Sequence, residues 1–409
     1  MVDCWLPYGD TEVYVSVEIE NLLGIAELKL VEPEKTAVEI ISDTLIEPSG
    51  KTIEELLTPG VKVAIAVDIY SHPYAVTQAL TELTKTLMDL IVPRDRIAII
   101  VGNGENEKEN SRLKEAITKV PELRNIMLID HNRNTSELTN LGETHRGTPV
   151  EINKRYQEAT LKIAIGETRV DPLTGYAGAH SAVVPGLASS ETIKEYRRNY
   201  FNADITPGSI EFNPLKEDVL EAVNKVGIDF ALNIITNNDG RMIAAHGGLY
   251  DETWGNGINS LADMREVSTK GGADIVVTSA GGDPFDQSLY PATWALINAV
   301  KATKKNGTIV LLAQCKAGLG AEAYTQLARV SELKELQRRY MFGTEALYLM
   351  KQVLKNNRII LVSALSDYLV ESIGLDTART ANEAYKKAIQ SRRSRKTVVI
   401  PHGCSSIWA

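Results

Sequence analysis

The chain has 409 residues, of which 44% are hydrophobic, 24% charged and 6% aromatic. This composition is typical of a folded globular protein and excludes a disordered or fibrous one. A single hydrophobic core rarely grows beyond about 250–300 residues, so the length predicts two domains. The formal net charge of −9 excludes a general attraction for nucleic acid or for an anionic membrane surface.

The cysteines and the N-terminus indicate a reducing, cytoplasmic location. Cys4, Cys315 and Cys404 are spread over the whole chain and form no CxxC pair or metal-ligand spacing. The first residues lack the basic start and apolar run of a signal peptide. No apolar segment approaches the ~20 residues that a membrane span needs. We therefore expect a cytoplasmic protein without a membrane partner.

The predicted elements alternate between short apolar runs rich in β-branched residues and longer amphipathic stretches. The first of them, Glu12–Glu20, alternates Val and Tyr with polar residues and predicts an appended antiparallel β element. The predicted strands are then Val61–Val67, Arg96–Val101, Ile126–Ile129, Leu161–Ile165, Phe230–Ile235, Ile275–Thr278, Thr308–Leu312, Ile359–Val362 and Val398–Ile400. The predicted helices are His72–Leu90, Glu107–Lys119, Pro214–Val226, Trp294–Thr303, Ala323–Leu333, Thr344–Leu354 and Thr377–Gln390. This alternation predicts the α/β class: two domains with mostly parallel sheets flanked by helices, and a cleft between them.

A polar stretch marks the expected domain boundary. Gly255–Lys270 is followed by two glycines and then by the strand-like run that begins at Ala273. The expected domains are therefore residues 1–270 and 271–409.

The loops that follow the predicted strands are the places to look for chemistry, because open parallel sheets bind ligands at the carboxyl ends of their strands. Asp68, Ser71 and His72 follow the first parallel strand directly. Two interpretations of Asp68 and Ser71 are open, capping of the next helix or contact with a ligand. Gly102 begins a glycine-containing turn whose backbone N–H groups can face an anion.

The stretch 166–186 is the most informative of these loops. Its small residues, Gly175 and Gly178 among them, let backbone amides approach a ligand closely, and Asp171, His180 and Ser181 add polar groups. A purely structural loop of this length is unusual in a compact domain, so a binding role is favoured.

Two further loops follow strands in the second half of the chain. The segment 279–290 contains Gly281, Gly282 and Asp286, leads into a helix, and is another candidate anion site. The segment 314–320 contains Cys315, for which a reactive thiol is possible but a buried, inert thiol is the commoner case.

Several motifs occur in the same order as in a known family. They are Arg146–Lys154, Gly175–Ser189 with Glu191–Ile193, and Gly281–Gln287, and they are framed by Leu6–Gly9 and Val399–Gly403. Over nearly its whole length the chain thus resembles the nickel-dependent lactate racemase family. The resemblance implies a nickel-bearing pyridinium mononucleotide that takes hydride from the α-carbon of a 2-hydroxy acid, while a histidine takes the hydroxyl proton. Such a cofactor is needed because protein side chains cannot accept hydride.

This sequence departs from the family at most catalytic positions. By the resemblance, the lysine that tethers the cofactor falls at Ser181, whose hydroxyl cannot form that amide-type link. The nickel-ligand histidine falls at Arg197, a permanently charged group that cannot coordinate a metal. Of the two base histidines, one falls at Asp171 and the other near Glu105 or Asn106. Carboxylates are weak bases unless burial raises their pKa.

The remaining family positions are partly kept. The family's substrate-holding glutamine and lysine fall at Pro291 and Trp294, and the arginine of the first loop falls at His72. The turn glycines, Asp68 and the pair Asp286-Gln287 are retained. His180 is either a replacement ligand or an ordinary loop histidine.

Three hypotheses follow from this mixture. The first is an isomerase, a racemase or epimerase, acting on a 2-hydroxy acid or related small carboxylate; the second is a protein that binds a small anionic metabolite without turnover; the third is metal-free acid–base chemistry by Asp171 and His180. The candidate catalytic residues are Asp171, His180, His72 and Glu105. The candidate cofactor-binding residues are Asp68, Gly102, Gly175, Gly178, Ser181, Arg197, Gly281, Gly282, Asp286 and Gln287. The cofactor that the resemblance implies is the nickel nucleotide, and the sequence leaves its metal ligands, the substrate and the oligomeric state open.

Overall fold

A computed structural model of the chain describes residues 1–102, 111–202, 205, 207–269, 271–390 and 394–409. These residues form two compact units. Unit 1 comprises Met1–Leu28, Val170–Pro172 and Arg265–Ala409, and unit 2 comprises Lys29–Arg169 and Leu173–Met264. The expected boundary at residue 270 lies near the start of the last segment of unit 1. A single cut cannot describe the division, because the first residues of the chain pair with its last strands.

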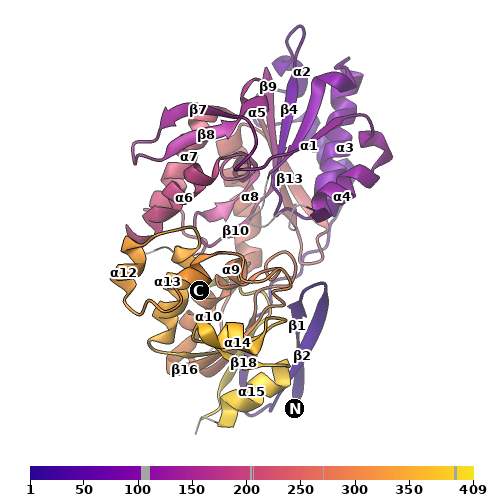
Figure 1. The fold of residues 1–409 in the computed structure, drawn as a ribbon. Coiled ribbons are helices and arrows are strands. Elements are labelled where there is room, and N and C mark those ends of the chain that lie inside the picture. Colours follow the sequence, from indigo (N-terminus) through magenta and orange to yellow (C-terminus); the bar gives the residue numbers. More distant parts are fainter. Residues whose placement is uncertain (103–110, 203–204, 206, 270, 391–393) are drawn as a thin grey trace. The chain divides into compact units, whose positions relative to one another are not determined.

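Unit 2 is built on a six-stranded sheet with the order β13-β12-β9-β4-β5-β6. Figure 1 labels β4, β9 and β13 of this sheet. Its strands are β4 (Val63–Val67), β5 (Ile97–Val101), β6 (Met127–Asp130), β9 (Leu161–Glu167), β12 (Phe230–Thr236) and β13 (Met242–Gly248). Neighbouring strands are parallel except β13, which runs antiparallel to β12. Five strands therefore end at one shared carboxyl edge.

The two faces of this sheet differ in side-chain size. Ile65 and Ile99 point into a core with α1 (Ala37–Ile46), α3 (Pro73–Asp89) and α4 (Ser111–Lys119). The next residues along the same strands, Ala64, Ala66 and Ala98, point to the opposite face because side chains alternate along a strand. These small side chains leave room for the part of the stretch 166–186 that follows β9, called the central loop below. Its short helix η3 (Ala179–Ala182) packs directly on β9, β4 and β12.

The other elements of unit 2 surround this framework. They are α2 (Ile53–Leu56), η1 (Arg94–Arg96), η2 (Pro121–Leu123), β7 (Leu138–Glu143), β8 (Pro149–Asn153), α5 (Lys154–Gln157), β11 (Gly175–Ala177), α6 (Ser190–Arg198), η4 (Asn199–Asn202), α7 (Pro214–Val226) and α8 (Tyr250–Arg265), the last residue of which belongs to unit 1. β7 and β8 form an antiparallel hairpin.

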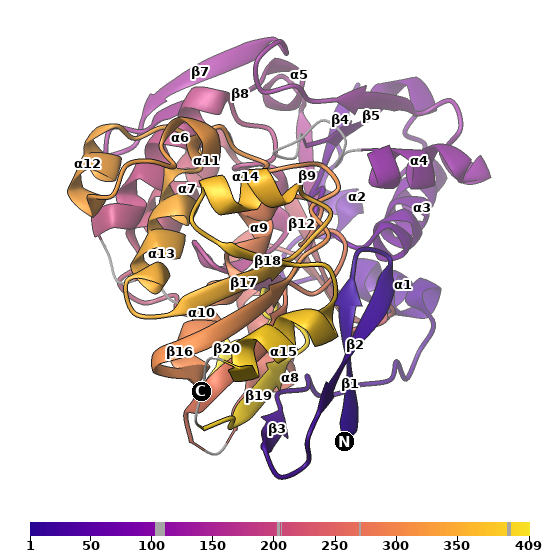
Figure 2. The same ribbon diagram turned by 60° about the horizontal axis from the view of Figure 1, so that its bottom comes forward.

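Unit 1 contains a second six-stranded sheet, with the order β18-β17-β16-β15-β19-β3 and parallel pairing throughout these strands (Figure 2). Its strands are β3 (Leu22–Ile25), β15 (Ala273–Ser279), β16 (Thr303–Leu312), β17 (Arg358–Val362), β18 (Asp376–Ala378) and β19 (Thr397–Ile400). α10 (Ala295–Ala302) and α13 (Thr344–Leu354) cover one face. α15 (Ala381–Gln390) and the hairpin β1–β2 (Val2–Tyr8 and Thr11–Val17) share the core of the other face.

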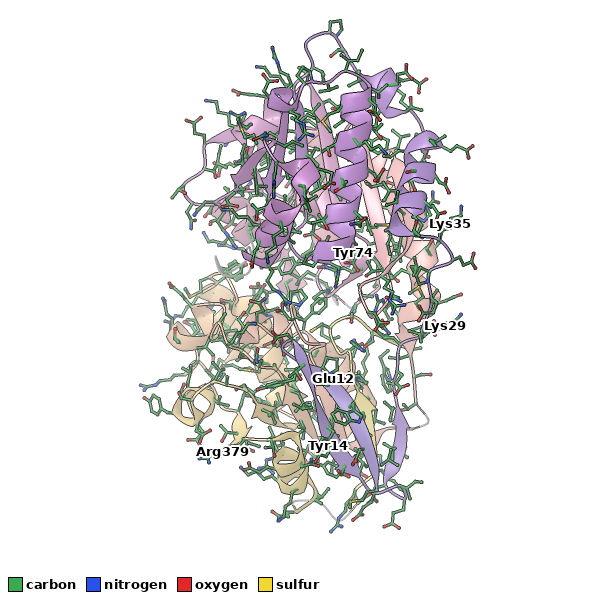
Figure 3. The ribbon with its side chains drawn as sticks, turned by 90° about the vertical axis from the view of Figure 1, so that its right-hand side faces the viewer. Glu12, Tyr14, Lys29, Lys35, Tyr74 and Arg379 are labelled. Carbon is green, nitrogen blue, oxygen red and sulfur yellow. The ribbon has the colours of Figure 1, made fainter. Side chains whose placement is uncertain are left out.

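The hairpin shows how its sequence pattern sets its burial. Cys4, Leu6 and Val15 are buried against the sheet. Trp5 and Tyr14 are exposed, and their ring centroids lie 5.3 Å apart across the two strands. Figure 3 labels Tyr14 on this hairpin. The remaining elements of unit 1 are β10 (Arg169–Asp171, whose first residue belongs to unit 2), β14 (Glu266–Val267), α9 (Leu289–Ala292), α11 (Ala323–Gln326), α12 (Leu333–Arg338), α14 (Asp367–Ser372) and β20 (Ile407–Trp408).

The structure confirms the α/β class and corrects two predicted helices and the interpretation of one polar stretch. The predicted helix Thr377–Gln390 begins only at Ala381, because Thr377 and Ala378 belong to strand β18. The predicted helix Ala323–Leu333 is wrong, because two short helices, α11 and α12, are separated by a helix-free stretch. The polar stretch Gly255–Lys270 is mostly helical, since α8 runs through both of its glycines. In the described part of the chain, no helix is both long enough and apolar enough to span a membrane.

Candidate functional site

A buried ion pair lies at the carboxyl edge of the unit 2 sheet. Asp68 follows β4 directly, and Arg169 follows β9, the neighbouring strand. Arg169 Nη1 lies 2.5 Å from Asp68 Oδ2, and the two side chains are only 11% and 4% exposed. The Tyr70 ring stands 5.4 Å from the guanidinium carbon, which adds a cation–π contact to the pair. The arginine therefore neutralises a carboxylate that has little access to water.

Ser71 connects this ion pair to a second carboxylate. Its hydroxyl donates to Asp68 Oδ2 at 3.2 Å and accepts from the Glu167 N–H at 2.8 Å. The Glu167 carboxylate in turn accepts from the His72 N–H at 3.0 Å and from the Thr236 hydroxyl. Helix α3 has no side-chain cap, so the capping interpretation of Asp68 and Ser71 is wrong. Their polar groups are used to join the ends of β4, β9 and β12.

His72, a catalytic residue predicted from the sequence, contacts this network through its backbone N–H and is also accessible to solvent. The residue is exposed, while its imidazole rests on Gly240, where an added Cβ would lie 2.1 Å from Nε2. Partial loss of water lowers the pKa of His72; the charge of Glu167 opposes this change and that of Arg112 adds to it. A lowered pKa keeps the imidazole neutral at neutral pH, and a neutral imidazole can accept a proton.

His180 and Ser181 lie together inside the central loop and are buried. The His180 ring meets Trp254 edge-on, with ring centroids 4.9 Å apart. Ser181 Oγ accepts from the Gly178 N–H at 3.3 Å and lies 3.5 Å from His180 Nε2. The Asn233 side chain holds the same turn by accepting from the Ala179 N–H at 2.8 Å.

The glycines of this region bring the backbone of the loop against the sheet. A Cβ at Gly166 would lie 2.7 Å from the carbonyl oxygen of Gly178, and one at Gly102 would lie 2.8 Å from that of Gly186. Gly175 has a φ of +85°, a conformation that other residues rarely adopt, and faces the carbonyl of Ser209. Close packing of the protein on itself is therefore sufficient to explain these glycines, without a ligand.

Arg197 lies in the last turn of α6 and is buried. Its Nε donates to the Tyr196 hydroxyl at 3.0 Å, and its guanidinium carbon lies 5.7 Å from the centre of the same ring. The hydroxyl and the ring of its neighbour thus hold the guanidinium in place.

In unit 1, Asp286 occupies a comparable position in the loop after β15. Its Oδ2 accepts from the backbone N–H groups of Gly9 at 2.7 Å and Gln314 at 3.0 Å. Burial raises the pKa of Asp286, and these two hydrogen bonds oppose the shift. Gly282 has a φ of +72° and packs on the carbonyl of Gly9. This loop therefore fastens the turn of the N-terminal hairpin to the end of the sheet.

The other predicted residues of this region are held by local contacts. Gln287 Nε2 donates to Asp283 Oδ1 at 2.7 Å. Gly281 has a φ of +115° beside His402. Cys315 is buried, and burial raises the pKa of its thiol, as expected for an inert cysteine. Asp171 is half-buried and belongs to unit 1, and Glu105 lies outside the described residues.

Sequence reasoning missed four members of the network in unit 2: Glu167, Arg169, Asn233 and Thr236. Glu167 and Thr236 are the last residues of β9 and β12. The rule that parallel strands present their final side chains at one edge could have found them. Nothing in the sequence indicates that Arg169, rather than a residue of the first loop, neutralises Asp68.

Together these features define an α/β protein with a buried polar network at the carboxyl edge of a parallel sheet, where such folds place small-molecule sites. A family model described as the lactate racemase N-terminal domain matches residues 8–206, and one described as the lactate racemase C-terminal domain matches residues 268–408. The chain therefore belongs to the lactate racemase family.

Individual relatives agree with this assignment. A lactate racemase from Thermoanaerobacterium thermosaccharolyticum is 26% identical over 430 aligned positions, which span 100% of this chain and 99% of the relative. A lactate racemase from Lactiplantibacillus plantarum is 25% identical, with both chains covered completely.

Solved structures share the fold. The lactate racemase apoprotein from T. thermosaccharolyticum matches with a TM-score of 0.84 at 22% identity and full coverage of both chains. A protein from Thermotoga maritima matches with a TM-score of 0.68 at 14% identity, over 93% of this chain and all of that one.

The residues do not fit a tethered, histidine-ligated nickel nucleotide. Ser181 is enclosed by its own loop, and Arg197 carries a permanent charge held by Tyr196. Within the residues that the structure describes, no three His, Cys, Asp or Glu side chains are grouped to hold a metal ion.

Proposed function

We propose that the protein is a racemase- or epimerase-type isomerase of a 2-hydroxy acid or related small carboxylate, with His72 as its proton acceptor. The position of His72 carries the proposal. Its backbone is fixed by Glu167 at 3.0 Å, its imidazole has a lowered pKa, and the residue is exposed at the carboxyl edge of a parallel sheet. Membership of the lactate racemase family supports the reaction class.

His72 and its neighbours can supply binding and proton transfer. The neutral imidazole can take the substrate's hydroxyl proton, and Glu167 stabilises the imidazolium that forms. Because side chains cannot accept hydride, these residues alone cannot complete an exchange at the α-carbon. The proposal therefore includes a co-reactant, bound without the lysine tether, that would take hydride from the α-carbon and return it to either face, while His72 returns the proton to the oxygen.

The test measures interconversion of pure D- and L-lactate, followed by other 2-hydroxy acids, by chiral chromatography. The protein is produced both alone and beside the family's cofactor-assembly enzymes, and its nickel content is measured.

We expect His72→Gln to lower kcat about 100-fold or more. The matched control is His145→Gln, since His145 is exposed and paired with Glu221 away from this network. Absence of interconversion in both preparations contradicts the isomerase. Interconversion with less than a tenth of an equivalent of nickel would show that its hydride acceptor is not a nickel nucleotide.

A second function, binding of a small anionic metabolite without turnover, is favoured by the structure around Ser181 and Arg197. Both side chains are buried and engaged with neighbouring groups of the protein. Fold alone does not determine activity, and a family member that has lost its tether and metal ligand can retain binding. Stabilisation of the protein by a carboxylate or a nucleotide in a thermal-shift screen, with no product formed, supports this alternative. A screen without any stabilising compound contradicts it.

A further inference from the structure

A hollow of about 650 Å³ lies at the amino edge of the unit 2 sheet. It is lined by the first residues of two strands, Val63 of β4 and Ile97 of β5, and by the residue before each, Lys62 and Arg96. The candidate site described above uses the carboxyl ends of the same strands. The hollow is therefore separate from that site, and its size falls within the roughly 300–1,000 Å³ of small-molecule pockets.

The side-chain pattern of the sheet explains why this space is not filled. Ala64 and Ala98 form part of its floor on the face that carries small residues. Above them lies α5, a helix of four residues that packs near β4 (Figures 1 and 2). Protein interiors are normally close-packed, and so short a helix cannot fill the volume over two alanines. The remaining apolar wall comes from Met127 and Ile129 of β6.

Charged side chains surround this apolar floor. Four cations and three acids line the hollow: Lys62, Arg96, Lys154 and Arg155, and Asp95, Glu137 and Glu158. Lys154 is held by Glu137 at 3.0 Å. In the described part of the chain, Lys62, Arg96 and Arg155 make no ion pair with a carboxylate. These three cations can therefore turn to a ligand without first breaking a salt bridge.

A polar group at the wall can also serve a ligand. Ser136 lines the hollow, and its oxygen accepts from the Asn132 N–H at 2.8 Å. A hydroxyl that accepts in this way still has its own hydrogen to donate. The hollow thus combines an apolar floor, a hydroxyl donor and a rim with four cations against three acids. These features suit a molecule with an apolar body and one acidic group that lies beside the cations.

We propose that this hollow binds a small amphipathic anion. An aromatic or short alkyl body lies on Ala64, Ala98 and Ile129. The carboxylate, sulfonate or phosphate group lies at the rim, beside Arg96 and Arg155.

The test uses anilinonaphthalene sulfonate, which combines an aromatic body with one anionic group. Fluorescence titration of the purified full-length protein should show saturable binding of one dye per chain. Ala98→Trp, which fills the floor, should abolish this binding.

The rim variant, Arg96→Glu with Arg155→Glu, changes two exposed positions and should weaken the binding about tenfold or more. The matched control is Lys334→Glu with Arg338→Glu on α12, also exposed, which should leave the dissociation constant within about twofold of the wild-type value.

The outcomes separate this proposal from the proposed function. Absence of saturable binding, or equal affinity in the rim variant and the α12 control, overturns the amphipathic-anion site. If Ala98→Trp does not fold, judged by circular dichroism, the rim variant decides alone. Lactate interconversion measured on the rim variant should equal that of the wild type, because His72 lies at the other edge of the sheet.

Discussion

The two units stabilise a buried aspartate in different ways. Each has a buried aspartate at the carboxyl edge of its sheet, Asp68 in unit 2 and Asp286 in unit 1. Asp68 is neutralised by the Arg169 guanidinium, whereas Asp286 receives two backbone N–H groups at one oxygen. A buried ion pair depends strongly on both partners, but backbone donors remain when the side chain changes. The comparison predicts that unit 2 is the more sensitive to substitution at its acid site.

Arg169→Met should have the largest effect, because it leaves Asp68 buried without its counter-ion. We expect a loss of about 3–5 kcal/mol in the free energy of unfolding, measured by urea denaturation. The double variant Asp68→Asn with Arg169→Met should recover most of this loss, since neither charge is then left unpaired. If the effects of the two single substitutions simply add in the double variant, the ion pair is not the cause.

Acid should destabilise the protein through a buried histidine in unit 2. The His131 Nε2 lies 3.0 Å from the Ala188 carbonyl oxygen, and its Nδ1 lies 3.2 Å from Asn153 Nδ2. Burial lowers the pKa of His131 to about 4. The unfolded chain therefore takes up this proton near pH 6.5, while the folded chain resists until about pH 4. Stability should fall by about 3 kcal/mol over this window as the pH decreases.

The measurement is urea denaturation at pH 7 and pH 4.5 for the wild type and His131→Gln. The variant should be less stable at pH 7 but should lose less stability on acidification. In unit 1, burial and the charge of Arg265 lower the pKa of His402 to about 4 as well, so His402→Gln should flatten the pH profile in the same direction. An unchanged slope in both variants would show that other groups control acid unfolding.

Substitutions of Asp286 test the backbone-donor solution in unit 1. Asp286→Leu should cost about 2 kcal/mol, because the N–H groups of Gly9 and Gln314 lose their acceptor. Asp286→Asn should cost much less. Its carbonyl oxygen can replace Oδ2, and its amide nitrogen can take the place of Oδ1, for which the described residues offer no hydrogen bond. Chemical denaturation at pH 7 compares the two, and equal losses would contradict this account.

The smallest expected effect concerns the close approach of the central loop to β9. Gly166→Ala should destabilise by about 1–2 kcal/mol, because its Cβ would press on the backbone of Gly178 and Ala179. Gly255→Ala is the matched control: it lies in helix α8 with no atom within 4 Å of its added Cβ, and should stabilise by up to about 1 kcal/mol. Thermal melts measure both, and equal shifts would exclude the steric explanation.

Much of the fold follows from local pattern. The first and last residues of α7 and α13 are the predicted ones. In α7 the amphipathic run begins at Pro214 and is followed by Gly227, and in α13 it is preceded by Gly343. Helix α8 was missed because Gly255 and Gly257 hide its periodicity, although tertiary packing overrides their weak helix propensity. Strand β3 was missed because its four half-buried residues gain stability from β19, a distant partner that no local pattern reveals.

The site was harder to predict than the fold. Asp68 and His72 could be located from the sequence, because they follow a continuous apolar strand and so lie at its carboxyl end; their functional roles stay predictions. The partnership of Asp68 with Arg169 depends on which strands are neighbours, and the sequence does not state that order. The glycines were interpreted as a cradle for a ligand, and in the structure an added Cβ at Gly102, Gly175 or Gly178 would press on the protein's own atoms, whereas one at Gly281 would make only ordinary contacts. A glycine-rich sequence indicates that another group lies close to the backbone there. It does not indicate whether that group is a ligand or another part of the protein.

The pairing of β3 with β19 also sets an order of events during synthesis on the ribosome. Unit 2 consists of residues that emerge before β15 is made, so its sheet can assemble while translation continues. The first 28 residues belong to unit 1 and must wait, with an unpaired strand edge, until the last strands leave the exit tunnel. If translation stopped shortly before residue 397, β19 would be missing and β3 would keep an unpaired edge. Such an edge can pair with other chains, so we expect the shortened protein to aggregate.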